Sequence, residues 1–280
     1  MKYILILLLL LIFPLSGIAE KHCVFTPING THGLSGNKVR NITQLPDGRM
    51  MITTEGLLNL YDGTNFSYLH YDREDICRLS DYSGFHHEYI DAHGYMWLKN
   101  QRQLMVVDIG RECFIERPDS LLALWGIDTP MKDFFMDKTK NLWVITDKDD
   151  LVRIDKTTLQ ASTFLNRVSL VYDLGVLDGN LYLFYRSGLL ICYAMESQKE
   201  IYRQKLSDEL PEGVYGNTSY VVPGTNTFYQ LCNGNRGGVM LAYDVERRKW
   251  NIVLQTSYWL NYLLIKTEAY GLVVIKDYGI

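Results

Sequence analysis

The densest group of side chains able to bind a metal lies in the segment HHEYIDAH at 86–93. It holds three histidines, a glutamate and an aspartate, and such groups bind zinc when three or four of them converge on one point. On an extended strand, however, successive side chains point to opposite faces, so His86 and His87 diverge, and His93 lies in the turn that follows. We therefore predict a solvated strand and turn, with no metal and no cofactor.

Other patterns that serve catalysis give no stronger signal. The glycine-rich GNRGG at 234–238 lies between two predicted strands, whereas a phosphate-binding loop precedes a helix. The carboxylate pair Asp149–Asp150 lies in a predicted turn, where solvated charge is expected, and the sequence contains no GxSxG or HExxH motif. We predict no catalytic residue, although acidic and basic groups from distant parts of the chain could still converge in the fold.

Three residues could contact a small ligand such as a sugar, because binding sites combine aromatic faces with a few polar groups. Trp125, Arg186 and Trp259 lie in predicted loops and are the candidates for ligand binding. Packing in the core is the competing interpretation, equally weighted for Trp125 and favoured for Trp259. The sequence does not identify the ligand.

The elements that would position such residues follow from a repeat. The stretch DGRMMITTEGLLNLYDGTNF at 47–66 contains three turn signals separated by short apolar runs, and similar units recur along the chain. Each unit has an anchor residue in the run after its first turn: Met51, Trp97, Trp143, Tyr182, Phe228 and Val273. Intervals of 46, 46, 39, 46 and 45 residues, with about four strands per unit, are typical of β-propeller blades. We predict an all-β chain that forms a β-propeller with about five to six four-stranded blades.

A β-sandwich with regular turns is the alternative fold, which six units in phase disfavour. The sixth unit stops at VVIKDYGI, so we predict an incomplete last blade and either an incomplete ring or an irregular closure. The segment CVFTPI at 23–28 resembles the outermost strand of a blade, and propellers often use an N-terminal strand to complete the last blade. A truncated copy of a longer protein is the favoured interpretation.

The N-terminus predicts export. Residues 1–19, MKYILILLLLLIFPLSGIA, combine a lysine, an apolar run and small residues, as a secretory signal peptide does, and residues 20–280 would then form the propeller domain in the periplasm. An uncleaved membrane anchor is the alternative. The net charge of −4, without a basic cluster, argues against nucleic acid as a partner. Five cysteines without a CxxC pair do not describe a disulfide scaffold, and we expect Cys113 and Cys192 to be buried.

The segment GLSGNKVRNITQLPDGRMMITTEGLLNLYDGTNFSYL at 33–69 resembles the two-component regulator propeller repeat. The matching positions are Gly33-Leu34-Ser35, Val39, Ile42, Asp47-Gly48, Thr54, Gly56-Leu57 and Tyr61-Asp62-Gly63. The usual tryptophan is replaced by Met51 in this unit but is present as Trp97 and Trp143 in the next two, and the resemblance covers about half of the chain.

This resemblance implies the periplasmic input region of a bacterial hybrid two-component sensor, many of which detect oligosaccharides released from glycans. The membrane helix and kinase of that family would follow downstream, so contact with the membrane is expected only through that region. We predict a non-catalytic sensor module that recognises a glycan fragment or forms a homodimer. An exported propeller enzyme, such as a polysaccharide lyase or glycosidase, and an interaction scaffold without a small ligand are the alternatives.

Overall fold

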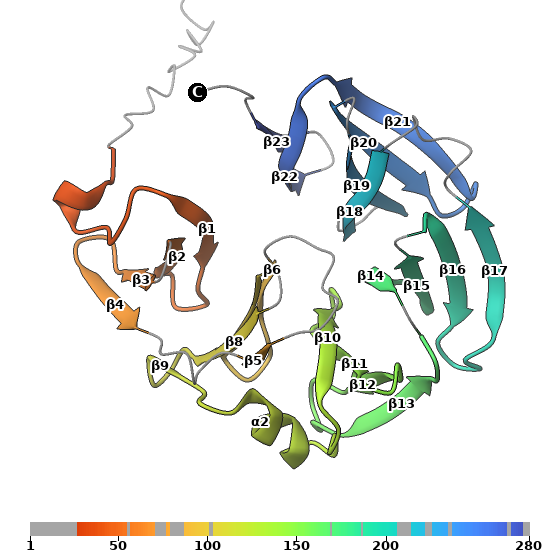
Figure 1. Cartoon of the computed structure of the whole chain (residues 1–280), viewed down its shortest axis with the longest axis horizontal. Coiled ribbons are helices and arrows are strands. Elements are labelled where there is room, and N and C mark those ends of the chain that lie inside the picture. Colours follow the sequence, from red (N-terminus) through yellow and green to blue (C-terminus); the bar gives the residue numbers. More distant parts are fainter. Residues whose placement is uncertain are drawn as a thin grey trace, which may run out of the picture.

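The strands of the chain form six antiparallel sheets arranged as blades around a common centre (Figure 1). The computed structural model describes residues 27–54, 57–70, 77–78, 87–100, 103–168, 170–185, 187–205, 214–221, 226–234, 237–267 and 270–276. Within these ranges, five sheets have four or five strands and a sixth has two. The predicted all-β propeller is confirmed.

Blade 1 consists of β1 (Val39–Gln44), β2 (Met50–Thr54), β3 (Leu57–Tyr61) and β4 (Phe66–His70). Blade 2 consists of β5 (Cys77–Arg78), β6 (His87–Ile90), β7 (Tyr95–Asn100), β8 (Gln103–Asp108) and β9 (Cys113–Phe114). Blade 3 consists of β10 (Met131–Met136), β11 (Leu142–Thr146), β12 (Leu151–Ile154) and β13 (Ala161–Leu165). Blade 4 consists of β14 (Val171–Leu177), β15 (Asn180–Tyr185), β16 (Leu189–Ala194) and β17 (Glu200–Lys205). Blade 5 consists of β18 (Val214–Val221), β19 (Thr227–Gly234), β20 (Gly237–Asp244) and β21 (Lys249–Thr256), and the sixth sheet consists of β22 (Trp259–Thr267) and β23 (Tyr270–Lys276).

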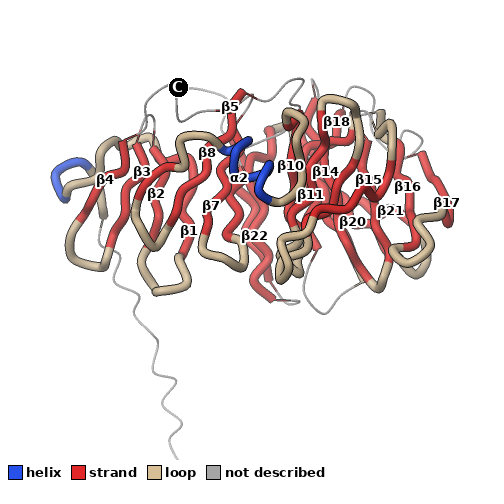
Figure 2. Tube along the Cα trace, turned by 90° about the horizontal axis from the view of Figure 1, so that it is seen from below, coloured by secondary structure: helices blue, strands red, loops and turns tan. Residues whose placement is uncertain are grey.

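Each blade runs outward from the centre of the ring. The strands of blades 1, 3, 4 and 5 are paired in chain order, and Figure 1 shows β1, β6, β10 and β14 closest to the centre. Figure 2 shows that the strands cross the thickness of the disc, so the turns between them gather on its two flat faces. The first strands therefore line the centre of the ring, where side chains from different blades meet.

The hydrophobic core is divided into clusters that each lie between two successive blades. Trp97 of β7 packs in the cluster between blades 2 and 3, and Trp143 of β11 packs in the cluster between blades 3 and 4; both are fully buried. Each of the six predicted anchors lies on the strand paired directly with the innermost one, namely β2, β7, β11, β15, β19 and β23, and in blades 1 to 5 this strand is paired on both sides. Large aromatic rings fill the gap that widens between blades away from the centre.

The fifth unit is one residue out of phase with the first four. In blade 3 the anchor Trp143 pairs with Phe135, two residues after the bulge position of the first strand. The equivalent pair in blade 5 is Tyr229 with Tyr220, so Tyr229 and not Phe228 corresponds to Trp143. Phe228 instead packs back against blade 4, in the cluster that contains Tyr182. The anchor predicted for this unit was therefore wrong by one residue, because a shift of one residue along a strand turns the side chain to the other face of the sheet.

The first strands of the blades share a feature that the repeat search missed. Asn41, Asp133 and Asp173 each follow a β-bulge in β1, β10 and β14, and each accepts a hydrogen bond at Oδ1 from the next backbone N–H, over 2.9, 2.7 and 2.8 Å respectively. This bond satisfies a donor that the irregular ladder leaves free. The bulges tilt the first strands where they approach the centre of the ring.

Three local features depart from the sequence predictions. The short helix α2 (Pro118–Leu124) follows blade 2, and a 3-10 turn, η1 (Gly30–His32), precedes blade 1; neither has a periodic pattern long enough to predict. Proline at the start of α2 suits a helix start and was the available signal. Cys192 is buried as expected, but Cys113 is exposed because it lies on the two-residue strand β9 at the rim of blade 2.

The contact between blades 4 and 5 generates a test of packing. A Cβ added to Gly175 of β14 would lie 2.3 Å from Cε1 of Phe228, so Gly175→Ala must push the two blades apart. We expect a loss of about 1–3 kcal/mol in the free energy of unfolding, measured by urea denaturation. Gly110→Ala is the control, because its Cβ would meet only Asp108 Oδ1 at 3.5 Å; equal stability losses in the two variants would contradict the packing described.

Candidate functional site

Glu88 belongs to β6, the strand of blade 2 that lies closest to the centre of the ring (Figure 1), and it contacts side chains of blade 1. Its Oε2 accepts a hydrogen bond over 2.8 Å from the hydroxyl of Thr43 on β1, and its Oε1 accepts one from the hydroxyl of Thr53 on β2. Asn41 of β1 is a third hydrogen-bond partner of the carboxyl. We call these four half-buried residues, Asn41, Thr43, Thr53 and Glu88, the inner polar cluster.

The position of Glu88 is occupied by buried apolar residues in blades 3 and 4, by the exposed Ile42 in blade 1 and by Ser219 in blade 5. Glu88 pairs with Leu98, the residue after the anchor, and Phe134 and Leu174 hold the corresponding positions of blades 3 and 4. Phe134 and Leu174 are buried in the hydrophobic clusters between blades. Packing alone therefore favours an apolar side chain here, and a carboxyl at this position needs another explanation.

Burial raises the pKa of the Glu88 carboxyl above its ordinary value, and the hydrogen bonds from Thr53, Thr43 and Asn41 lower it only in part. A low-dielectric surrounding disfavours the charged form, and neutral donors compensate less than a cation would. Shifted pKa values of this kind are frequent at functional sites. The inner polar cluster is the candidate functional site of this chain.

Lys99 of β7 makes the corresponding contact between blades 2 and 3. Its Nζ is fully buried and donates to Asp133 Oδ1 and to the carbonyl oxygen of Phe134, over 2.7 Å in both cases. The ammonium also lies 4.1 Å from the ring centroid of Phe135. A buried charge with two strong acceptors and an aromatic face is paired well enough to persist, so Lys99 fastens blade 2 to blade 3.

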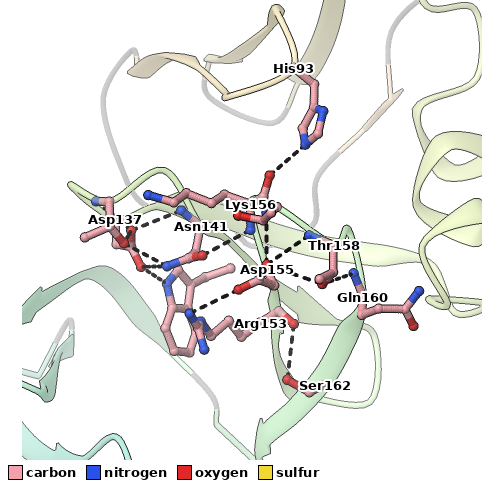
Figure 3. Close-up of polar contacts among 12 residues, drawn as sticks. His93, Asp137, Asn141, Arg153, Asp155, Lys156, Thr158, Gln160 and Ser162 are labelled. Carbon is pink, nitrogen blue, oxygen red and sulfur yellow. Dashed lines mark hydrogen bonds and ion pairs between the residues drawn. The ribbon is translucent and has the colours of Figure 1, made fainter.

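In segment 86–93, Glu88, Asp91 and His93 each contact different partners, whereas His86 and the side chain of His87 lie outside the described residues, so their opposite orientation stays a prediction. Glu88 faces blade 1, whereas Asp91 accepts hydrogen bonds from the backbone of His93 and from Trp97 Nε1, over 2.8 and 2.9 Å. His93 Nε2 contacts the carbonyl oxygen of Lys156 in blade 3 at 2.7 Å (Figure 3). Among the residues that the structure describes, no group of three or more His, Cys, Asp or Glu is arranged to hold a metal ion.

Asp91 is one of two aspartates that hold an anchor tryptophan. In blade 3, Asp137 Oδ2 accepts from Trp143 Nε1 over 2.9 Å, and its Oδ1 accepts from the backbone of Thr139 and Asn141 (Figure 3). Leu45 occupies the corresponding position in blade 1. Its backbone N–H donates to the carbonyl oxygen of Arg49, four residues later, and the N–H groups of Asp91 and Asp137 make the same bond in their own turns. Aspartate thus accompanies tryptophan, and Leu45 accompanies Met51 in one hydrophobic cluster.

Of the three predicted ligand candidates, the two that the structure describes make their contacts away from the inner polar cluster. Trp125 follows α2, is buried, and has its ring centroid 5.9 Å from that of Trp97. Trp259 is half-buried at the start of β22, where its Nε1 donates to the carbonyl oxygen of Gly234 over 3.0 Å, and Arg186 lies outside the described residues. As ligand-binding residues all three stay predictions.

The remaining sequence candidates lie in turns. Asp149 pairs with Lys132 over 2.8 Å in the turn between β11 and β12. Gly234 and Gly237 end and begin the paired strands β19 and β20, as expected of a loop between strands. Over the described part of the chain, no helix combines the length and apolar character needed to cross a membrane.

The signal for Glu88 was present in the sequence but not used. The 46-residue interval that relates the first three anchors also leads from Ile42 to Glu88 and from Glu88 to Phe134. The same interval leads from Thr53 to Lys99. Comparing the repeats column by column would have shown a carboxyl where the neighbouring units have apolar residues, whereas reading segment 86–93 on its own suggested only a metal.

Comparison with known proteins supports the fold. No protein-family model and no curated protein sequence matches the chain. Among solved structures, the chain is similar to the extracellular domain of BT4673 from B. thetaiotaomicron, described as a one component system, with 16% identity and a TM-score of 0.54. The match covers 88% of this chain and 34% of that domain, so the chain spans about a third of its length.

Two further solved structures are similar over most of this chain. The extracellular domain of BT3049 from B. thetaiotaomicron, described as a hybrid two component system, has 15% identity and a TM-score of 0.47, with 85% of this chain and 39% of that domain covered. YCF48 bound to D1 peptide has 9% identity and a TM-score of 0.51, with 81% of this chain and 72% of that chain covered. At these identities the likeness to BT4673 and YCF48 establishes the propeller fold that this chain shares with them.

The raised pKa of Glu88 generates a pH prediction. Below its ordinary pKa the carboxyl is protonated in both the folded and the unfolded chain and carries no penalty. As the pH rises, the unfolded chain ionises first, so the folded state loses stability until the pH passes the folded pKa. We therefore expect Glu88→Gln to gain stability relative to the wild type as the pH rises from about 4 to 8, measured by urea denaturation. A stability difference independent of pH would contradict the shift, and Glu196→Gln, in an exposed turn of blade 4, is the control.

The buried ion pair generates a second prediction. Lys99→Met leaves the carboxylate of Asp133 buried without its cation, so we expect a loss of about 3–5 kcal/mol in the free energy of unfolding. Adding Asp133→Asn should restore part of this loss, because Asn41 makes the same bulge hydrogen bond without a charge. Lys132→Met removes a partly exposed ion pair and should cost at most about 1 kcal/mol. A Lys99→Met loss no larger than that of Lys132→Met would refute the fastening role of Lys99.

Proposed function

We propose that the chain is a non-catalytic, periplasmic ligand-sensing propeller module of a bacterial two-component signalling system. It recognises a glycan fragment or mediates dimerisation of the sensor. The observation that carries this proposal is the propeller fold, which the chain shares with the extracellular domain of a protein described as a one component system. The repeat at 33–69, with its Gly-Leu-Ser linker and Tyr-Asp-Gly turn, supports the same family of sensors independently of the fold.

The arrangement of the blades supports recognition of a small ligand. Binding sites favour concave places where several elements present polar groups to one point. Here the first strands of the blades meet at the centre of the ring, and at least one contact between them, that of blades 1 and 2, carries polar side chains. A soluble oligosaccharide that reached this centre would touch several blades at once.

Export to the periplasm is part of the proposal. The leader at 1–19 lies outside the described residues, and its cleavage stays a prediction. The extracellular origin of the BT4673 domain supports an exported location. Dimerisation is proposed for the sensor as a whole, and sedimentation velocity over a range of concentrations measures it.

The test is thermal unfolding of the purified chain with and without a panel of oligosaccharides. A ligand that binds only the folded state stabilises it by about 2.7 kcal/mol at a concentration 100 times its Kd. For a chain of this size we expect a rise of roughly 5 °C in the unfolding midpoint with a recognised oligosaccharide. A panel that leaves the midpoint unchanged would contradict the sensing function.

The same samples separate the sensor from its enzymatic alternative. A polysaccharide lyase or a glycosidase would consume the oligosaccharide, and chromatography of the sugar after incubation would detect its products. The sensor returns the sugar intact after it has raised the unfolding midpoint. An interaction scaffold without a small ligand would produce neither effect.

A further inference from the structure

We propose that the inner polar cluster is the subsite that binds the ligand, and that it takes hydroxyl groups of a neutral oligosaccharide. This inference deepens the proposed sensing function and rests on it. The cluster is defined by Glu88 of blade 2 with Asn41, Thr43 and Thr53 of blade 1.

Glu88 differs in polarity from the residues at the same position of blades 3 and 4. Phe134 and Leu174 hold this position in blades 3 and 4, and both are buried in the apolar contact with the preceding blade. A carboxyl in this place costs the desolvation of a charge and gains only neutral hydrogen-bond partners. A residue that is unfavourable for stability and is nevertheless present at the meeting point of two blades fits a binding role.

The direction of the hydrogen bonds determines which groups the cluster presents to a ligand. Thr43 and Thr53 both donate their hydroxyl protons to the carboxyl, so their oxygens keep lone pairs and no proton for another partner. Each carboxylate oxygen also has more than one lone pair. The cluster therefore presents mainly acceptors, together with the second N–H of the Asn41 amide, and a ligand with hydroxyl groups can serve both because a hydroxyl donates and accepts.

The charge of Glu88 favours a neutral ligand over an acidic one. Burial raises the pKa of Glu88, and the side chains that lower it by hydrogen bonding, Thr53, Thr43 and Asn41, are all neutral. An acidic sugar, carrying a carboxylate or a sulfate, would be repelled by the ionised form of Glu88, and the three hydrogen-bond partners of that carboxyl carry no charge to offset the repulsion. A neutral sugar meets no such repulsion, and its hydroxyl groups form charge-assisted hydrogen bonds to the ionised carboxyl.

The inner polar cluster is accessible to solvent. Asn41, Thr43, Thr53 and Glu88 each keep part of their surface exposed, so the cluster is not sealed from solvent. In contrast, the polar contact at the next blade interface is closed, because the Lys99 side chain has no exposed surface and is occupied by Asp133 and Phe134. The contact between blades 1 and 2 is therefore the one of these two that a ligand can reach.

The experiment measures binding of matched neutral and acidic oligosaccharides to the wild type, Glu88→Gln and the control Glu196→Gln, by thermal shift and calorimetry. We expect a neutral oligosaccharide to raise the midpoint of the wild type and of the control, and Glu88→Gln to raise its Kd roughly tenfold or more. If an acidic oligosaccharide binds in place of a neutral one, or if Glu88→Gln binds as the wild type does, the subsite is refuted while the sensing function stands. If no oligosaccharide binds the wild type, the sensing function itself fails, and this subsite fails with it.

A second variant tests the subsite without any ligand. Glu88→Leu introduces the residue type that blade 4 has at this position. If Glu88 is kept for binding, this variant should be at least as stable as the wild type in urea near neutral pH. If Glu88 serves only to hold blades 1 and 2 together, the variant loses stability, and that result would overturn the inference even where a sugar binds.

Discussion

Each sheet of this protein can bury its faces only against the sheets beside it. The hydrophobic clusters show this constraint directly, because every one of them combines residues of two successive sheets. A blade therefore has no hydrophobic core of its own, and the stability of each repeat depends on its neighbours. The constraint also explains why corresponding residues of the repeats differ in type and yet face the same neighbouring blade.

Polar residues enter these contacts in two different ways. At the contact of blades 2 and 3, Lys99 and Asp133 neutralise each other out of reach of water, so the charges serve cohesion. At the contact of blades 1 and 2, the described hydrogen-bond partners of Glu88 are neutral, and the residue is partly exposed. The two sites lie at related positions of the repeat, which makes the difference between a closed and an accessible polar contact visible within one chain. Lys99 occupies the repeat position that Thr53 has in blade 1. One position of the repeat therefore contributes to the closed ion pair in blade 2 and to the accessible polar contact in blade 1.

The fold was largely predictable from the sequence, because turn signals and apolar runs are local and recur with the period of a blade. The placement of all six anchors on the strand next to the innermost one follows from that period alone. The phase of the fifth unit was not predictable in this way: the choice between Phe228 and Tyr229 depends on strand register, which is set by contacts across the sheet. The exposure of Cys113 likewise depends on how short β9 is, which its apolar neighbours did not reveal.

The candidate site was less predictable than the fold, because its residues come from two units of the chain. The segment with Glu88 drew attention for its histidines, and its actual partners, Thr43 and Thr53, lie in the preceding unit. The pairing of aspartate with tryptophan in blades 2 and 3, and of Leu45 with Met51 in blade 1, has a related consequence for how such a chain can change. A gene conversion or a duplication that carried only the tryptophan into another repeat would bury an indole N–H without an acceptor. The tryptophan and the aspartate six residues before it must therefore be exchanged between blades together if the indole N–H is to keep this acceptor.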